Sequence, residues 1–87
     1  MSSLFGTVAD SVADRVKAAI ESALLGAEVE VVTRAPGHLS IRVVSDAFEG
    51  KSLVNKQRLV YRAIAPLMSG PDAPVHAIDQ LETVVPG

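Results

Sequence analysis

The sequence contains no cysteine and no tryptophan in its 87 residues. Without cysteine the chain cannot form a disulfide, supply a thiolate nucleophile, or complete an iron–sulfur or structural zinc site on its own. Only 3% of the residues are aromatic, which is too few for a surface that stacks nucleic-acid bases. Any metal cluster bound by this chain would therefore need sulfur ligands from another molecule.

The chain also lacks long apolar runs, and none approaches the roughly 18 residues of a membrane-spanning helix. Residues 1–8 have neither the basic start nor the apolar stretch of a signal peptide. We therefore expect a soluble protein of the cytoplasm, or of an organelle stroma or matrix as a mature chain.

Charge is nearly balanced, with 8 basic and 10 acidic residues and a formal net charge of −2. This balance argues against a nucleic-acid surface that covers the whole chain, although it leaves a local basic patch open. The apolar fraction of 48% argues against disorder. The length predicts one domain over residues 1–87, with residues 1–6 flexible.

An apolar residue recurs at every fourth position over residues 8–24, which predicts an amphipathic helix. These residues are Val8, Val12, Val16, Ile20 and Leu24. Thr7 is the expected N-cap, and Gly26 is the expected stop signal.

Two alternating segments follow, Glu28–Thr33 and Leu39–Ser45, and each predicts a β-strand. Pro36-Gly37 between them is a strong turn signal, so the two strands should form an antiparallel hairpin. The residues expected to face the core are Val29, Val31, Leu39, Ile41 and Val43.

The rest of the chain predicts a second helix and a third strand. The helix should run over residues 52–65 and break at Pro66, which cannot donate a backbone hydrogen bond. Pro66 should then begin a short further helical turn through Met68. Phe48, in the turn before the helix, should fold back onto the core. The last strand should start at Val75 and run to about residue 83, with a bulge or an early end where Asp79 and Gln80 interrupt the alternation.

This order of elements predicts an α+β domain with a three-stranded mixed sheet and the helices packed on one face. About thirty residues with a helix separate the second and third strands, which favours a right-handed crossover between parallel neighbours. His38 opens the second strand and His76 opens the third. We therefore expect the chain's two histidines at the same end of the sheet.

Enzymatic functions are disfavoured. The sequence has no H-E-x-x-H, no Walker loop and no nucleophile elbow, and Ser45-Asp46 is a turn at a strand end. Asp79 and Glu82 could approach His76, but a domain of this size has little room for a pocket. We expect a non-enzymatic protein.

Three segments together resemble the BolA family. Ile41–Lys51 is similar to the family's "V-V-S-x-x-F-x-G" signature, and Leu53–Tyr61 is similar to its basic second helix. Val75–Ile78, read as Val-His-Ala-Ile, is similar to its "[IV]-H-A-[LI]" signature. The resemblance extends from about Val8 to Pro86. It implies an αββααβ fold akin to class II KH domains, the same element order that the pattern of residues predicts.

The resemblance also implies a function. BolA proteins bind monothiol glutaredoxins, with which they hold a shared [2Fe–2S] cluster in iron–sulfur trafficking or iron and redox regulation. It implies that His76 is a cluster ligand, with the remaining sulfur ligands supplied by the glutaredoxin cysteine and glutathione. The family's second ligand is a His or Cys in the loop between the first two strands. That loop has no cysteine here, and its only histidine is His38, which is the candidate for the second ligand. His38 matches the histidine that the family has at the start of this strand rather than the family's usual loop ligand.

Other interpretations stay open. His76 could merely cap a strand edge, and Gly37-His38 could be turn chemistry. A basic face on the second helix could bind a glutaredoxin, bind nucleic acid as in a transcriptional regulator, or simply be solvated; its residues are Lys51, Asn55, Lys56, Arg58 and Arg62. The KH G-x-x-G loop is missing, which favours a protein partner over nucleic acid. The sequence does not decide whether the isolated chain forms a homodimer.

Overall fold

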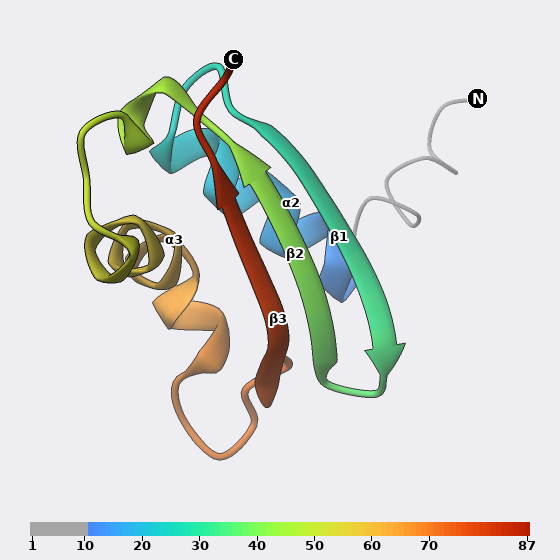
Figure 1. The fold of residues 1–87 in the computed structure, drawn as a ribbon. Helices are drawn as coiled ribbons and strands as arrows, with labels where there is room; N and C mark the ends of the chain where they lie inside the picture. The colour runs from blue at the N-terminus through green and yellow to red at the C-terminus, as the bar shows by residue number, and fades with distance from the viewer. Residues whose placement is uncertain (1–10) are drawn as a thin grey trace.

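A three-stranded sheet with two helices on one side makes up the computed structural model, which describes residues 11–87 (Figure 1). The elements are α2 (Val12–Ala23), β1 (Glu28–Ala35), β2 (His38–Val44), the 3₁₀ turn η1 (Asp46–Phe48), α3 (Leu53–Met68) and β3 (Ala77–Val84). The predicted α+β class with a three-stranded mixed sheet is confirmed, and α3 is one helix where the sequence predicts a helix followed by a separate short helical turn.

The strands lie in the order β1-β2-β3, so β2 is central. β1 pairs with β2 antiparallel, and β2 pairs with β3 parallel, as the short Pro36-Gly37 link and the long helical crossover predict. Each ladder contains one irregularity. Arg34 is the extra residue between the Thr33 and Ala35 pairs of β1, and Asp79 is the extra residue of β3. The interruption expected at Asp79 is therefore a bulge, and it does not end the strand.

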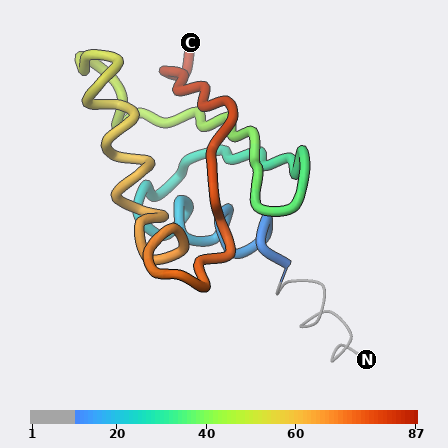
Figure 2. The backbone as a smooth tube through the Cα atoms, turned by 90° about the horizontal axis from the view of Figure 1, so that it is seen from below, coloured from blue at the N-terminus to red at the C-terminus, as the bar shows by residue number. Residues whose placement is uncertain are grey.

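Both helices cover the same face of the sheet, and the two views agree on this (Figures 1 and 2). α2 packs on β1 and α3, and α3 packs on β3. The inward residues predicted for β2 are all buried, and Phe48 is completely buried beneath the end of β2. The core consists of Val16, Ile20, Leu24, Val29, Leu39, Ile41, Val43, Phe48, Val60, Ile64 and Val75. No helix within residues 11–87 has the length and apolar character needed to cross a membrane.

The first described helix begins later than the periodicity predicts. Ser11 has an extended backbone, and its hydroxyl accepts a hydrogen bond from the Asp14 amide over 3.1 Å, so it is the N-cap of α2. The predicted continuous helix from Val8 to Leu24 is therefore wrong, because the extended backbone of the capping Ser11 makes Val12 the first residue of α2. The predicted cap at Thr7 and the prediction for residues 1–6 lie outside the described residues.

The predicted end of the second helix at Pro66 is also wrong. α3 continues through Pro66 to Met68. Proline removes one backbone hydrogen bond, but only the last turn of this helix is affected. Leu67 and Met68 beyond it pack against the core, and the Leu67 carbonyl accepts a hydrogen bond from the Val75 amide over 3.1 Å. Tertiary packing outweighs the local preference for a break.

Candidate functional site

The N-terminal ends of β2 and β3 form one rim of the sheet, which contains both histidines. We call Gly37, His38, His76 and Asp79 the histidine rim. The carbonyl of Gly37 accepts hydrogen bonds from the amides of His76 and Ala77, over 2.8 and 3.0 Å. His38 is the register partner of Ala77. The predicted placement of the two histidines at the same end of the sheet is confirmed for the backbone.

The backbone of Gly37 lies directly against the imidazole ring of His76. Its φ is 78°, a left-handed conformation that glycine adopts without strain. A Cβ at this position would lie 2.6 Å from Nδ1 and 2.8 Å from Cγ of the His76 ring. The Nδ1 edge of the ring therefore faces the Gly37 backbone, and the opposite edge carries Nε2. His76 is an exposed residue, so its ring is accessible to a partner molecule.

His38 is oriented by a carboxylate. Its Nδ1 lies 3.0 Å from Oδ1 of Asp79, and both side chains are a little under half exposed. An ionised carboxylate can only accept, so this contact places a ring proton on Nδ1, and in the neutral tautomer the lone pair is then on Nε2. The arrangement resembles the way outer carboxylates orient metal-binding histidines. His38 and Asp79 are 41 positions apart, and the bulge in β3 brings them together.

The acidic residues on β3 differ in their contacts. Asp79 contacts His38, whereas Glu82 pairs with Nε of Arg42 over 3.2 Å, away from the rim. Because side chains alternate along a strand, His38 and Asp79 belong to the open face of the sheet, and His76 lies one position before Ala77. The Asp79–His38 pair is the part of the rim that the sequence alone did not reveal.

The rim does not form a complete metal site. Residues 11–87 contain no group of three or more His, Cys, Asp or Glu side chains that could hold a metal ion. The chain can supply imidazole ligands only, and two histidines can replace two cysteines on one iron of a [2Fe–2S] cluster. The donor set therefore fits half of a cluster whose other ligands come from another molecule.

A basic groove lies on α3. It has a volume of about 210 Å³ and is lined by Lys51, Asn55, Arg58, Leu59 and Arg62. Four of the five residues predicted for a basic face thus lie together, while Lys56 is half-buried and does not line the groove. Ser52 caps the helix by accepting from the Asn55 amide, which fixes the start of this face. Three cations without an acidic residue in the lining make the groove suitable for an anionic surface.

α3 also carries three exposed large apolar side chains that do not line the groove. Leu53, Val54 and Tyr61 on the same helix are between 40% and 62% exposed. Lys51 follows the C-terminal end of β2, whereas His38 begins β2 at the other end. The basic groove and the histidine rim are therefore separate surfaces, joined by the length of α3.

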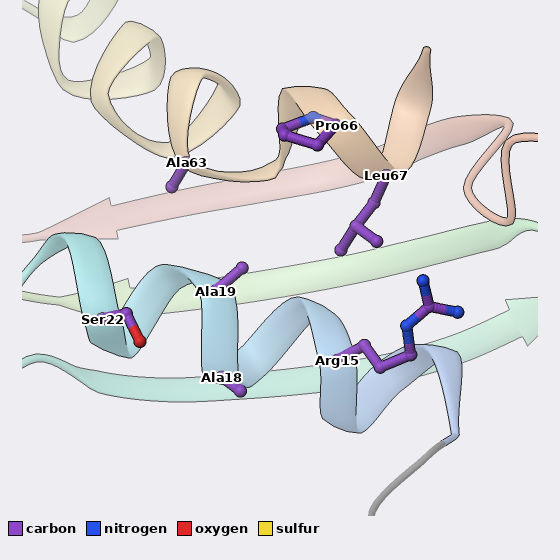
Figure 3. Close-up of a pocket in the computed structure, with 7 residues that line it drawn as sticks. All are labelled: Arg15, Ala18, Ala19, Ser22, Ala63, Pro66 and Leu67. Atoms are coloured by element: carbon purple, nitrogen blue, oxygen red, sulfur yellow. The ribbon is translucent and has the colours of Figure 1, made fainter. Parts of the chain in front are cut away.

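A third surface lies between the two helices (Figure 3). This groove of about 400 Å³ is lined by Arg15, Ala18, Ala19, Ser22, Ala63, Pro66 and Leu67. The side chains of Ala19, Ala63 and Leu67 point across the gap, and two of these three are the single methyl groups of alanine. Arg15 is the only charged residue of this lining, and the groove therefore has no cluster of reactive side chains.

Comparisons with known proteins agree on one class. A mixed three-stranded sheet with helices on one face is the fold of solved BolA structures, and the model of the family described as BolA-like protein matches residues 11–86. The chain belongs to the BolA-like protein family. A search of curated proteins found no significant match.

Several solved structures are similar over most of the chain. A BolA-like protein from Babesia bovis is 30% identical with a TM-score of 0.68, and the match covers 90% of this chain and 88% of that one. The BolA domain of SufE1 from Arabidopsis thaliana is 31% identical, with a TM-score of 0.68 and coverage of 87% and 93%. BolA1 from Arabidopsis thaliana is 24% identical, with a TM-score of 0.72 and coverage of 88% and 94%, and supports the fold.

Proposed function

We propose that this protein is a non-enzymatic adaptor that binds a monothiol glutaredoxin and shares a [2Fe–2S] cluster with it, in iron–sulfur trafficking or iron and redox regulation. Membership of the BolA-like family supports this role. The observation that carries the proposal is the exposed His76 ring, whose backbone is anchored to the Gly37 carbonyl at the histidine rim. His76 is the proposed ligand, and His38 is the proposed second ligand.

Any cluster that this chain binds has to be shared with another molecule. A [2Fe–2S] cluster needs four protein or small-molecule ligands, usually thiolates, and this chain has no cysteine. The glutaredoxin cysteine and glutathione would supply the sulfur ligands. The cluster would then form only at the interface, and the isolated chain would bind none.

The rim residues have distinct roles in this proposal. Nε2 of His76 is the nitrogen remote from the Gly37 backbone and can reach a partner's iron. In the neutral ring, Asp79 holds the proton on Nδ1 of His38, so that the lone pair a metal needs lies on Nε2. Gly37 and Asp79 are therefore positioning residues.

The decisive experiment mixes the protein with a cluster-loaded monothiol glutaredoxin and follows visible absorption and circular dichroism. The spectrum should change on mixing, and His76→Ala should abolish the change. Gln80→Ala, which removes an exposed polar side chain further along β3, is the matched control and should behave as the unmodified chain. An unaltered spectrum with His76→Ala would show that the ligand assignment is wrong.

Complex formation is measured separately by size-exclusion chromatography with apo-glutaredoxin. If the two proteins associate and the cluster spectrum is indifferent to His76→Ala and His38→Ala, the protein is an interaction domain without a metal role. If they do not associate at all, the proposed partner is wrong.

The basic groove supports a second candidate, a nucleic-acid-binding regulator that uses α3. Three cations line the groove, and Tyr61 beside it is 40% exposed. Binding to duplex DNA at low salt should then weaken with Arg58→Ala and Arg62→Ala, and the dependence of affinity on salt should become less steep. The absence of binding at low salt would dispose of this candidate.

A further inference from the structure

β1 is an edge strand of the sheet. In the part of the chain that the structure describes, β1 pairs with β2 on one side only. It is eight residues long and contains no proline, and its bulge at Arg34 lies near its end, so a row of backbone amides and carbonyls from Glu28 to Thr33 is available for pairing with another strand. β1 is therefore a surface on which a further strand could be added.

The open face of β1 carries a self-complementary series of side chains. Val29 and Val31 face the core, so Glu28, Glu30 and Val32 lie on the opposite face of the strand. Arg34, the bulge residue, lies on that face too, because it contacts Ser40, the register partner of Val32. Val32 is 41% exposed and is one of the large apolar side chains that the core leaves uncovered. Arg34 donates through Nε to the Ser40 hydroxyl over 3.0 Å, which leaves its terminal amino groups to contact a neighbour.

We propose that a second copy of this chain pairs with the first through β1, antiparallel and about a two-fold axis at Val32. Val32 of one copy then lies opposite Val32 of the other, and Glu30 of each lies opposite Arg34 of its mate. Two three-stranded sheets join into one sheet of six strands. The interface is the same patch on both copies, as a two-fold dimer requires.

The central apolar contact and the charges together select this register. Pairing about Val31 would also place Glu28 opposite Arg34 twice, but it would place Glu30 opposite Val32. A shift of one residue would turn the apolar core side of one strand toward the open face of the other. A shift that placed the two Glu30 side chains opposite each other would bring like charges together, which disfavours pairing. Pairing about Val32 is the register that satisfies both the central apolar contact and two opposite-charge pairs.

The geometry also predicts a closed dimer with independent histidine rims. β1 meets β1, so the assembly does not grow into a filament. Since the paired strands run in opposite directions, the two Pro36-Gly37 turns lie at opposite ends of the joined sheet. The dimer therefore leaves both rims exposed, and His76→Ala should not alter it. A failure of dimerisation and a failure of the proposed cluster role are distinguishable for this reason.

Sedimentation over a range of protein concentrations tests the proposal. The pairing surface is small, so we expect weak association, with a dissociation constant of roughly 10 μM to 1 mM. Glu30→Arg and Arg34→Glu should each raise that constant about tenfold or more, because each places like charges opposite one another twice. Asp72→Arg makes the same kind of charge change on an exposed loop remote from β1 and should leave the dissociation constant unaltered.

An equimolar mixture of the two single variants provides the sharpest test. In a mixed pair the variant residues restore two opposite-charge contacts, so Glu30→Arg and Arg34→Glu chains should associate with each other although neither associates with itself. If Arg34→Glu unfolds the chain through loss of the Ser40 contact, Val32→Lys should also prevent dimerisation by facing two lysines at the axis. A monomer at every concentration up to about 1 mM, or a dimer indifferent to these variants, would overturn the proposal.

Discussion

The ring of His76 lies so close to Gly37 that no side chain fits between them. A Cβ added to Gly37 would lie 2.6 Å from Nδ1 of that ring, below the 3.0 Å that real Cβ contacts respect. The Gly37 carbonyl simultaneously accepts the amides of His76 and Ala77. One glycine thus fixes both the backbone and the imidazole of the residue that we propose as the cluster ligand.

Gly37→Ala should destabilise the fold and displace the His76 ring. Its positive φ costs an alanine about 1–2 kcal/mol, and the clash adds to that cost. Gly26→Ala is the matched control, because Gly26 has a φ of 82° and no atom within 4 Å of the added Cβ. Denaturant unfolding should show losses for both variants, with the larger loss for Gly37→Ala. Only Gly37→Ala should shift the imidazole resonances of His76 and weaken cluster sharing, and identical behaviour of the two variants would refute this role.

Asp79→Ala should weaken cluster retention without preventing complex formation. Loss of the carboxylate removes the contact that orients the His38 ring and fixes its tautomer. The loss of such a partner of a metal ligand typically lowers metal affinity about tenfold or more. The measurement is the rate at which the mixed complex loses its visible absorption. Glu82→Ala removes a carboxylate from the same strand that pairs with Arg42, so it should leave the rate unchanged. Equal rates for Asp79→Ala and the unmodified chain would argue that His38 is not a ligand.

Two valines on α3 test the location of the core. Val60 is completely buried and Val54 is 55% exposed. Val60→Ala should lower the free energy of unfolding by about 1.5–3 kcal/mol, because it removes two buried methyl groups and leaves a cavity. Val54→Ala should change it by less than about 0.5 kcal/mol, as surface substitutions do. Urea unfolding of both variants measures the difference, and a similar effect of the two would contradict the orientation of α3.

The basic groove should accelerate binding of an acidic partner surface. Arg58→Ala and Arg62→Ala together should lower the association rate constant with glutaredoxin by about threefold or more at low salt, with little difference at high salt. Stopped-flow mixing at several salt concentrations measures this. Arg15→Ala removes a cation from α2, outside the basic groove, and should have no comparable effect. A rate constant independent of salt in the unmodified chain would exclude this steering role.

Much of the fold could be predicted from local patterns. The alternation in β2 identified Leu39, Ile41 and Val43 as core residues, and Pro36-Gly37 identified the hairpin turn. The interruption at Asp79 predicted an irregularity in β3, which the structure has as a bulge. These features depend on neighbouring residues, so the sequence itself contains the signal.

Other features depend on contacts between distant residues. The helix continues past Pro66 because Leu67 and Met68 pack against the core, which no local rule includes. The pairing of His38 with Asp79 needs both the parallel register and the bulge, whereas the sequence suggested that Asp79 approaches His76. The ring contact of Gly37 likewise becomes visible only when β3 lies beside the hairpin.

The parallel pairing of β2 with β3 also determines at which stage of folding the histidine rim forms. His38 and Asp79 are 41 positions apart, and the strand that carries Asp79 is the last element of the chain. Contacts of such long range form late in folding, after local turns and helices. If the histidine rim binds a cluster as proposed, the domain could accept it only after β3 has joined β2, when the hairpin and both helices are already in place. Delivery of a cluster would then require a fully folded domain.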